Sequence, residues 1–239
     1  MKIVFVLLAL FFSFVVVTLS TSAWAARSSS GGSMAVGVMG GFVNSEQTHI
    51  NTLRARANQR AGGISASDLD RAYEFGPFIQ WRAGLLAFQL RPSYFMQKEG
   101  SGAYEYSTSG YTVEGHFKLY PLENQDVKLY FETGVAYGSQ KTSIKEDTFT
   151  VDAEGSSLGY LVGLGVEILW GPHAIILEGG WRYLPIERNI VTASNGTPAT
   201  GANPSVSQYD VNGELEYDGR DLSTNMSGTK MMIGYAYNF

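Results

Sequence analysis

The chain has 239 residues, a formal net charge of −5 at pH 7 and no cysteine. The lack of cysteine excludes a disulfide-stapled fold, a thiolate metal site and a cysteine nucleophile. A nucleic-acid-binding protein is expected to carry a basic surface, so the acidic balance argues against such a partner. The 28 glycines, 14 tyrosines and only 7 prolines are typical of many short strands with aromatic ends.

The N-terminus has the pattern of a secretory signal peptide. Lys2 precedes an almost unbroken apolar run over residues 3–17, and Ala23-Trp24-Ala25 supplies an A-x-A cleavage site. We assign the signal peptide to residues 1–25 and a single domain to residues 26–239. An uncleaved anchor is the alternative, but the run is shorter than the roughly 20 residues of a spanning helix.

The rest of the chain contains segments in which apolar and polar residues alternate. Alternation puts the two sets on opposite faces of a strand, and each segment is close to or above the roughly 9–11 residues of a tilted membrane-crossing strand. Pro77 and Pro92 each remove a ladder hydrogen bond, which predicts local weakening or a bulge. The eight predicted strands cover residues 34–43, 71–81, 85–97, 109–120, 127–138, 158–170, 175–183 and 224–239.

The connections between these segments alternate in length. Short turns are predicted around residues 82–84, 121–126 and 171–173, and long polar loops over 44–70, 98–108, 139–157 and 187–223. Short turns on one rim and long loops on the other are typical of outer-membrane barrels, in which the turns are periplasmic and the loops extracellular. The sequence therefore predicts an all-β fold, an eight-stranded antiparallel transmembrane up-and-down β-barrel. A ten-stranded closure that uses loop hairpins stays open.

The final strand supports this prediction. It places Met231, Ile233, Tyr235, Tyr237 and Phe239 on one face. Gly234, Tyr237 and Phe239 resemble the C-terminal assembly signal of outer-membrane barrels, although Met232 stands where that pattern prefers a polar residue.

The whole mature chain resembles the small eight-stranded outer-membrane barrels, the group of OmpX, the OmpA membrane domain and OmpW. The resemblance implies a protein of the Gram-negative cell outer membrane. It also implies contact with outer-membrane lipid and lipopolysaccharide, folding by the barrel-assembly machinery through the C-terminal strand, and a monomer. Being architectural, the resemblance indicates class and location rather than activity.

The inner face of the predicted barrel carries most of the charge. Because unpaired charge in a narrow interior is costly, we expect an ion-pair network that fills the lumen. A narrow, porin-like conduction path for small or hydrophobic solutes, as in an OmpW-like channel, and catalytic carboxylates are the alternatives. The predicted lumen charge network consists of Glu74, Arg82, Arg91, Glu114, His116, Lys118, Lys128, Glu132, Glu167, Glu178, Arg182 and Lys230.

Aromatic residues lie near the ends of the predicted strands. Amphipathic rings at such positions suit the interface between lipid tails and headgroups. The predicted aromatic girdle consists of Trp81, Tyr120, Trp170, Trp181 and Tyr183.

No residue pattern indicates an enzyme. A lipid A-modifying esterase would need a serine beside a histidine, and His49, His116 and His173 have no serine two residues away on the same face. A serine on a neighbouring strand stays open. We therefore expect a non-enzymatic barrel, without cofactor, whose surface loops interact with the envelope or the environment.

Two loops carry charged patterns of opposite sign. Arg54, Arg56 and Arg60 could contact lipopolysaccharide phosphates or the acidic last loop. The spacing Asp210-x-Asn212-x-Glu214 resembles a calcium loop, but Leu215 replaces its required glycine. The same region fits a hairpin with a type I′ turn at Asn212-Gly213 better, so no metal site is assigned.

Overall fold

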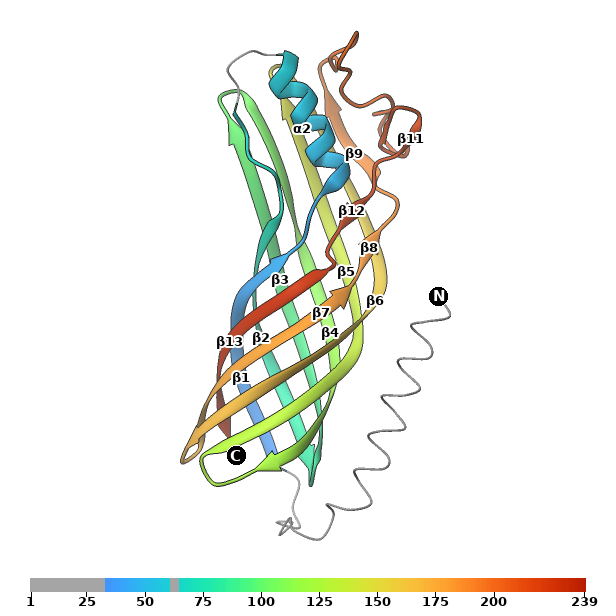
Figure 1. The fold of residues 1–239 in the computed structure, drawn as a ribbon. Coiled ribbons are helices and arrows are strands. Elements are labelled where there is room, and N and C mark those ends of the chain that lie inside the picture. The colour runs from blue at the N-terminus through green and yellow to red at the C-terminus, as the bar shows by residue number, and fades with distance from the viewer. Residues whose placement is uncertain (1–32, 61–64) are drawn as a thin grey trace, which may run out of the picture. The chain divides into compact units, whose positions relative to one another are not determined.

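The computed structural model describes residues 33–60 and 65–239; the predicted signal peptide lies outside this part of the chain. Its main feature is a barrel of eight long strands (Figure 1). They are β1 (Ser33–Asn44), β2 (Arg71–Ala83), β3 (Leu86–Ser101), β4 (Tyr104–Glu123), β5 (Val127–Glu146), β6 (Phe149–Trp170), β7 (His173–Tyr183) and β13 (Gly228–Asn238).

The eight strands form a closed antiparallel ring. Neighbours follow the order β5-β4-β3-β2-β1-β13-β7-β6, and a β5–β6 pairing closes the circuit. If paired residues are followed from strand to strand around the ring, a path that leaves β1 at Met34 returns to β1 at Asn44. Such a shift along the strand means that the strands are tilted relative to the barrel axis. The path runs through Trp81, Phe88, Phe117, Thr133, Val162, Trp181 and Thr229. The predicted eight-stranded barrel is confirmed, and loop strands do not enter the ring.

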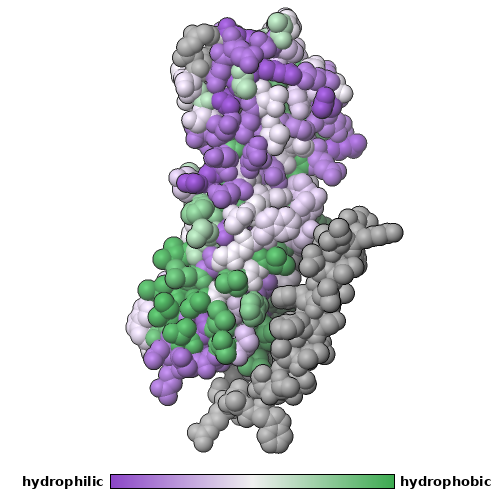
Figure 2. Space-filling model, viewed as in Figure 1, coloured by the Kyte–Doolittle hydropathy of each residue, from purple (hydrophilic) through white to green (hydrophobic). Residues whose placement is uncertain are grey.

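Strand alternation gives the barrel an apolar outer face. The outward side chains are apolar over residues 34–42 of β1, and Asn44 is the first polar one. On β2 and β3 the change from apolar to polar comes at Arg71 and Lys98, and on β4 at Ser109. The result is an apolar band around the half of the barrel nearest the short turns. Figure 2 shows this band in green below a polar half.

The two strand prolines face each other. The β2–β3 ladder pairs Phe75 with Tyr94 and Ile79 with Leu90, and it is interrupted between these pairs. Pro77 and Pro92 occupy opposed positions in this gap, where neither can donate a backbone hydrogen bond. The register is the same on both sides, so the prolines weaken the ladder without a bulge.

Two of the predicted long loops are strands instead. The β3–β4 pairing continues to Ser101–Tyr104, and the β5–β6 pairing continues to Glu146–Phe149. These extensions lie beyond the apolar band, so their outward residues are polar and resemble a loop in composition. The inward residues Tyr106 and Val151 are nevertheless buried, which keeps the period of a strand.

The first loop contains a helix that the sequence analysis missed, α2 (Thr48–Arg60). Ile50, Leu53 and Ala57 recur at helical spacing and are buried, so the pattern was present but short. The last loop contains short strands: β8 (Pro185–Ile186), β9 (Ile190–Asn195), β10 (Glu216–Tyr217), β11 (Arg220–Asp221) and β12 (Thr224–Asn225).

The helix and the last loop cover the inner side of the extended strands. β9 pairs with β6 beside the ring, and residues 224–225, predicted as part of the last strand, pair with β8 instead. We call α2, residues 184–227 and the extensions of β3–β6 the loop-end cap. Its apolar core contains Ile50, Leu53, Ala57, Leu69, Tyr106, Ile144, Phe149, Val151, Ala153, Val191, Val206, Leu215, Tyr217 and Leu222. Among the described residues, no helix is long and apolar enough to cross a membrane.

The predicted type I′ turn at Asn212-Gly213 is wrong. The Gly213 amide donates to the Asp210 carbonyl at 2.9 Å, so Val211 and Asn212 are the central residues of that turn. A two-residue hairpin with both residues at positive φ occurs instead at Asp218-Gly219 (53° and 68°), between β10 and β11. The Asp-Gly pair is itself a strong signal for this turn.

Replacing Leu53 with alanine tests how α2 is held. Removal of a fully buried leucine side chain should cost about 2–5 kcal/mol. Because α2 lies outside the ring, the loss should fall on the cap. Limited trypsin digestion should then cleave at Arg54, Arg56 or Arg60 faster than in the wild type.

Gln59→Ala is the matched control, since Gln59 is exposed on the same helix. Equal digestion of the two variants would contradict the packing of α2 against the cap core.

Candidate functional site

The centre of the barrel interior is the carboxylate of Glu114. Lys230 Nζ lies 2.7 Å from one of its oxygens, Arg182 Nη1 2.7 Å and Arg91 Nη2 2.9 Å. These side chains come from four strands, β4, β13, β7 and β3, and all are buried. The inward position on each strand therefore brings four groups that are distant in sequence to one point.

Further charges surround this centre. Glu178 accepts hydrogen bonds from Arg91 (2.8 Å) and from the Tyr130 hydroxyl (3.0 Å). Glu74 lies 2.9 Å from Arg182 and 3.7 Å from Lys230. We call Glu74, Arg91, Glu114, His116, Lys118, Glu132, Glu178, Arg182 and Lys230 the charged belt.

His116 and Lys118 complete the belt from β4. Nδ1 of His116 is 3.0 Å from Glu132, and Nε2 is 3.1 Å from Glu114. Lys118 Nζ lies 3.8 Å from Glu178 and 4.0 Å from the centroid of the Tyr130 ring. It has no hydrogen-bond partner among the described residues and is held by charge and by the aromatic face.

Apolar layers lie on both sides of the charged belt. The turn-end layer contains Met39, Phe78, Ala87, Tyr120, Tyr130, Ala174, Ile176, Met232 and Ala236. The loop-side layer contains Ala72, Phe95, Ala136, Leu161, Leu184, Ile186 and Met226. Each barrel strand that contributes to both a layer and the belt passes through them in the same order, so the charges lie between two mainly apolar layers. Buried polar side chains also occur in these zones, Gln80 and Gln89 on the turn side and Ser93 on the loop side.

Glycines on the inner face make room for large side chains of the belt and of the turn-end layer. A Cβ at Gly165 would lie 2.3 Å from the Tyr130 ring, and one at Gly163 would lie 2.8 Å from Glu132. Large side chains of β5 therefore fill the space that small residues of β6 leave free, so that the interior of the ring is closely packed.

Three predicted network residues lie away from the belt. Arg82 and Lys128 form ion pairs with Glu123 at the turn-end rim, apart from the belt. Their strand ends lie beyond the turn-end layer, where water can reach them. Glu167 is buried and accepts a hydrogen bond from the Tyr120 hydroxyl at 2.5 Å, without an ion-pair partner among the described residues.

Tyr120 is not part of an outer girdle. It is fully buried inside the barrel, where it contacts Gln80 and Glu167, because it shares the inward parity of His116 and Lys118. The other predicted rings, of Trp81, Trp170, Trp181 and Tyr183, are exposed on the outer face. Tyr160, which the prediction omitted, packs 5.3 Å from the Tyr183 ring.

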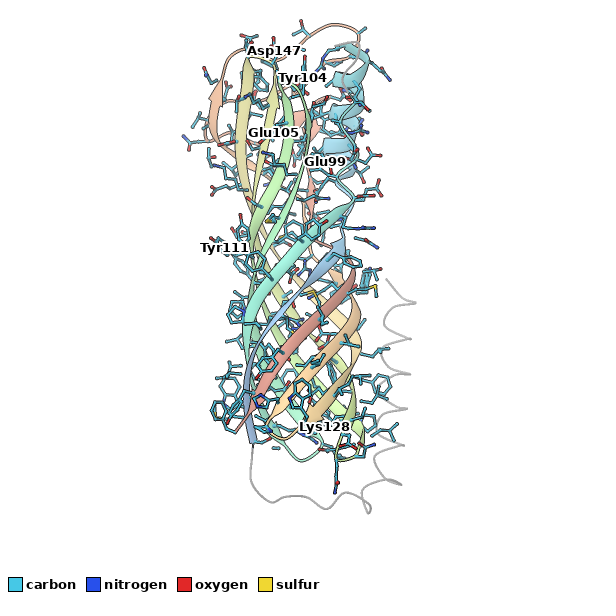
Figure 3. The ribbon with its side chains drawn as sticks, turned by 90° about the vertical axis from the view of Figure 1, so that its left-hand side faces the viewer. Glu99, Tyr104, Glu105, Tyr111, Lys128 and Asp147 are labelled. Carbon is cyan, nitrogen blue, oxygen red and sulfur yellow. The ribbon has the colours of Figure 1, made fainter. Side chains whose placement is uncertain are left out.

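Outward tyrosines also mark the loop-side edge of the band. Tyr111 projects from the barrel wall in Figure 3, well below the acidic hairpin tips at Glu99, Glu105 and Asp147. Tyr94 and Tyr111 pack with ring centroids 5.3 Å apart. Alternation accounts for their outward direction, and both lie where the outward residues of β3 and β4 change from apolar to polar.

The predicted assembly residues end the last strand. Tyr237 and Phe239 are outward and exposed, with ring centroids 5.1 Å apart. Gly234 faces inward, where a Cβ would lie 2.1 Å from the Met39 sulfur. The Phe239 amide donates to the Met34 carbonyl at 2.8 Å, so the chain end is joined to the start of β1.

The loop arginines bind within the chain. Arg56 makes two hydrogen bonds to Asp218, at 2.9 and 2.6 Å, and these bonds lower the pKa of the Asp218 carboxyl. Arg60 pairs with Glu146 and Arg54 with Asp68. Contact between the first and last loops, one of the two expected roles, is observed for Arg56 and for Arg60, which also donates to the Asn203 carbonyl, whereas Arg54 pairs within its own loop.

The calcium-like spacing does not form a ligand set. Glu214 lies with Glu216 and Asp221, all with an oxygen within 4.8 Å of one another, whereas Asp210 accepts from Gln208. Arg188 lies 3.3 Å from Glu214 and 3.7 Å from Asp221. One cation from the chain thus already offsets part of the negative charge of this cluster.

A serine does approach one histidine. Ser223 Oγ lies 3.0 Å from His49 Nδ1, and the Ser223 amide donates to the same nitrogen at 2.9 Å. Within the described residues no carboxylate is hydrogen-bonded to this ring. Because the single lone pair of Nδ1 already accepts a backbone amide, the pair is suited to docking α2 against the last loop rather than to nucleophilic catalysis.

Comparisons with known proteins give only distant structural likenesses. No family model and no curated relative matches the chain. Among solved structures, it is similar to Neisserial surface protein A at 15% identity and a TM-score of 0.38, covering 87% of this chain and 99% of that one. The translocator domain of the autotransporter NalP from Neisseria meningitidis has 12% identity and a TM-score of 0.37 over 97% of each chain. The outer membrane protease OmpT from Escherichia coli has 9% identity and a TM-score of 0.36 over 91% of this chain and 100% of that one.

Replacing Glu114 with glutamine should strongly destabilise the barrel. The substitution removes the charge that compensates three buried cations, and breaking a buried pair costs about 3–5 kcal/mol. Urea unfolding of the refolded barrel measures the change in the free energy of unfolding.

Glu105→Gln is the matched control, because its ion pair with Lys98 (2.8 Å) is exposed and should contribute about 0–1 kcal/mol. Equal losses in the two variants would show that Glu114 does not have the central role described above.

The His49 contact predicts acid sensitivity of the cap. Burial and the nearby Arg220 charge lower the pKa of His49 below its ordinary 6.5. The undocked cap therefore takes up the proton first, so docking is strongest above about pH 6.5 and weakens as the pH falls below it. Protection of the Ser223 amide from hydrogen exchange, corrected for the intrinsic rate, should fall over the same range.

His49→Gln should make this protection nearly independent of pH over the same range. A pH dependence that persists in the variant would assign the effect to other groups.

Proposed function

We propose that this protein is an integral outer-membrane barrel of a Gram-negative cell envelope. In this proposal its lumen is closed by the charged belt, and the loop-end cap is its interacting surface. Its function is non-enzymatic and consists of contacts that the loop-end cap makes with the envelope or the environment. Each part of the proposal rests on a separate feature of the described residues.

The apolar band is the observation that carries the membrane location. Outward side chains such as Phe75, Val135 and Leu158 are 54%, 66% and 76% exposed, and similar residues occur on all eight strands. Monomeric soluble proteins rarely expose apolar patches larger than a few hundred Å². A continuous band around a closed barrel suits a hydrocarbon environment, since closure leaves no unpaired sheet edge in lipid.

The choice of the outer membrane rests on the sequence. A signal-peptide pattern at residues 1–25 and the terminal Gly234, Tyr237 and Phe239 favour export and assembly by the barrel-assembly machinery. The turn end then faces the periplasm and the loop-end cap faces outside the cell. Lipid and lipopolysaccharide are the partners of the band, and the barrel acts as a monomer.

The sealed interior favours a closed barrel over a channel. The charged belt has apolar layers above and below it, and the cap core lies beyond the loop-side layer. An ion that entered the belt would have to cross layers of mainly apolar side chains on both sides, where few buried polar groups, such as Gln80 and Gln89, could replace its hydration shell. The OmpW-like channel for small or hydrophobic solutes is therefore the less supported function.

Two measurements on refolded protein test this proposal. The membrane location predicts that the protein inserts into lipid vesicles and that an unheated detergent sample migrates differently from a boiled one in electrophoresis. Identical migration together with failure to float with vesicles would overturn the membrane assignment.

A planar-bilayer recording tests the closed lumen. The inserted barrel should give no reproducible single-channel steps, whereas a water-filled porin in the same bilayer serves as the positive control. Regular steps that change size in Lys230→Gln would establish a path through the belt and overturn the closed-lumen proposal.

A further inference from the structure

The apolar band contains a groove on the side where the first and last strands meet. The groove has a volume of about 590 Å³ and crosses β2, β1, β13 and β7. Its rims are formed by outward side chains, among them Val38, Phe75, Ile233 and Tyr235, which are all well exposed. Its lining consists of Val38, Met39, Gly40, Phe75, Gly76, Pro77, Ile175, Ile233, Gly234 and Tyr235.

The groove exists because an outward position lacks a side chain. Gly40 pairs with Phe75 on one side and with Ile233 on the other, and it has the outward parity of Val38 and Phe42. A Cβ at Gly40 would meet Phe75 Cβ only at 3.8 Å and the Glu74 carbonyl oxygen at 3.9 Å. The backbone therefore does not require glycine here; the space above it is open.

The shape of the groove selects a flexible apolar occupant. A second convex barrel would touch the rims and leave the floor unfilled, which forfeits contacts across the gap. A stable protein interface also needs about 1,200–2,000 Å² of buried surface, whereas the groove is a narrow local hollow. A hydrocarbon chain can follow the floor and contact both rims.

A polar pair lies at the turn end of the groove. The Tyr235 hydroxyl, beside the groove, lies 2.5 Å from Nδ1 of His173, and His173 begins β7 at the rim next to Trp170 and Tyr237. When Nδ1 accepts a hydrogen bond from the tyrosine hydroxyl, Nε2 carries the ring hydrogen. That N–H has no partner among the described residues and can donate to a phosphate oxygen.

We propose that this groove binds one phospholipid of the turn-end leaflet, with an acyl chain over Gly40 and the headgroup phosphate beside His173. The inference rests on the proposed membrane location and adds a specific lipid site to it. In the outer membrane this leaflet is the periplasmic one. The bound lipid would fill the surface beside the β1–β13 seam, where the two ends of the ring are joined.

Native mass spectrometry of the full protein, refolded in detergent with added phosphatidylethanolamine, tests the site. The wild type should retain one lipid per barrel. Gly40→Leu fills the floor and should reduce retention about tenfold, the effect of losing roughly two buried methylene groups. Gly179→Leu is the control, because Gly179 is also an outward glycine of the band, with nothing within 4 Å of a built Cβ.

A second variant tests the headgroup contact. His173→Phe keeps the ring but removes the N–H donor, so it should weaken retention of phosphatidylethanolamine while leaving retention of a neutral diacylglycerol unchanged. Equal loss of both lipids would overturn the assignment of the phosphate to His173.

The failures of the two proposals are distinguishable. If every variant inserts into vesicles and keeps its heat-dependent migration, but Gly40→Leu and Gly179→Leu retain lipid equally, only the groove proposal is overturned. If the wild type forms a dimer that Gly40→Leu abolishes, the occupant is a second copy and the lipid proposal is again wrong. Failure of the wild type to insert at all would instead count against the membrane location.

Discussion

Closure of the hydrogen-bonded ring is the constraint on which the rest of this structure depends. The β1–β13 and β5–β6 pairings join the strands into a circuit, so the strands that carry the apolar band leave no free sheet edge. Closure divides every strand into an inner and an outer face. The outer face is apolar in the half near the turns, and the inner face must fill a narrow space with the remaining residues. Both the apolar band and the charged belt follow from this division.

The interior satisfies that demand by layering. Glu114 collects Arg91, Arg182 and Lys230 at a single height, and apolar residues fill the space on either side. Buried ion pairs add little net stability over apolar packing, but removal of one partner is costly. The main effect of the belt is therefore to select one arrangement of the interior, and its net contribution to the free energy of unfolding is small. Inward glycines provide the volume that larger side chains occupy, Gly163 beside Glu132 of the belt and Gly165 beside Tyr130 of the turn-end layer.

The loop end has a different organisation from the apolar-band half. There the extended strands β3–β6 are no longer part of a closed ring, and α2 with residues 184–227 covers their inner side. The loop-end cap is held together by an apolar core and by ion pairs such as Arg56–Asp218 and Arg60–Glu146. The outer surface of the protein at this end is therefore a packed cap rather than a set of independent loops. A rigid cap can present a defined surface to a partner with less loss of conformational entropy on binding.

The sequence alone was enough to predict the eight strands, which face of each points inward, and the polar character of the lumen. This is because alternation with period two is a local property that every strand displays. Local pattern did not reveal where the strands end at the loop side, since Ser107 and Ser143 lie beyond the apolar band and are polar although their strands continue there. It could not separate Arg82 and Lys128 from the belt or place Tyr120 inside, because height in the barrel depends on register between strands. The partners of Glu114, the pairing of Arg56 with Asp218 and the groove over Gly40 join residues distant in the chain. Only the tertiary structure decides such contacts, because they follow from the stagger of the ring and from how side chains fill its interior.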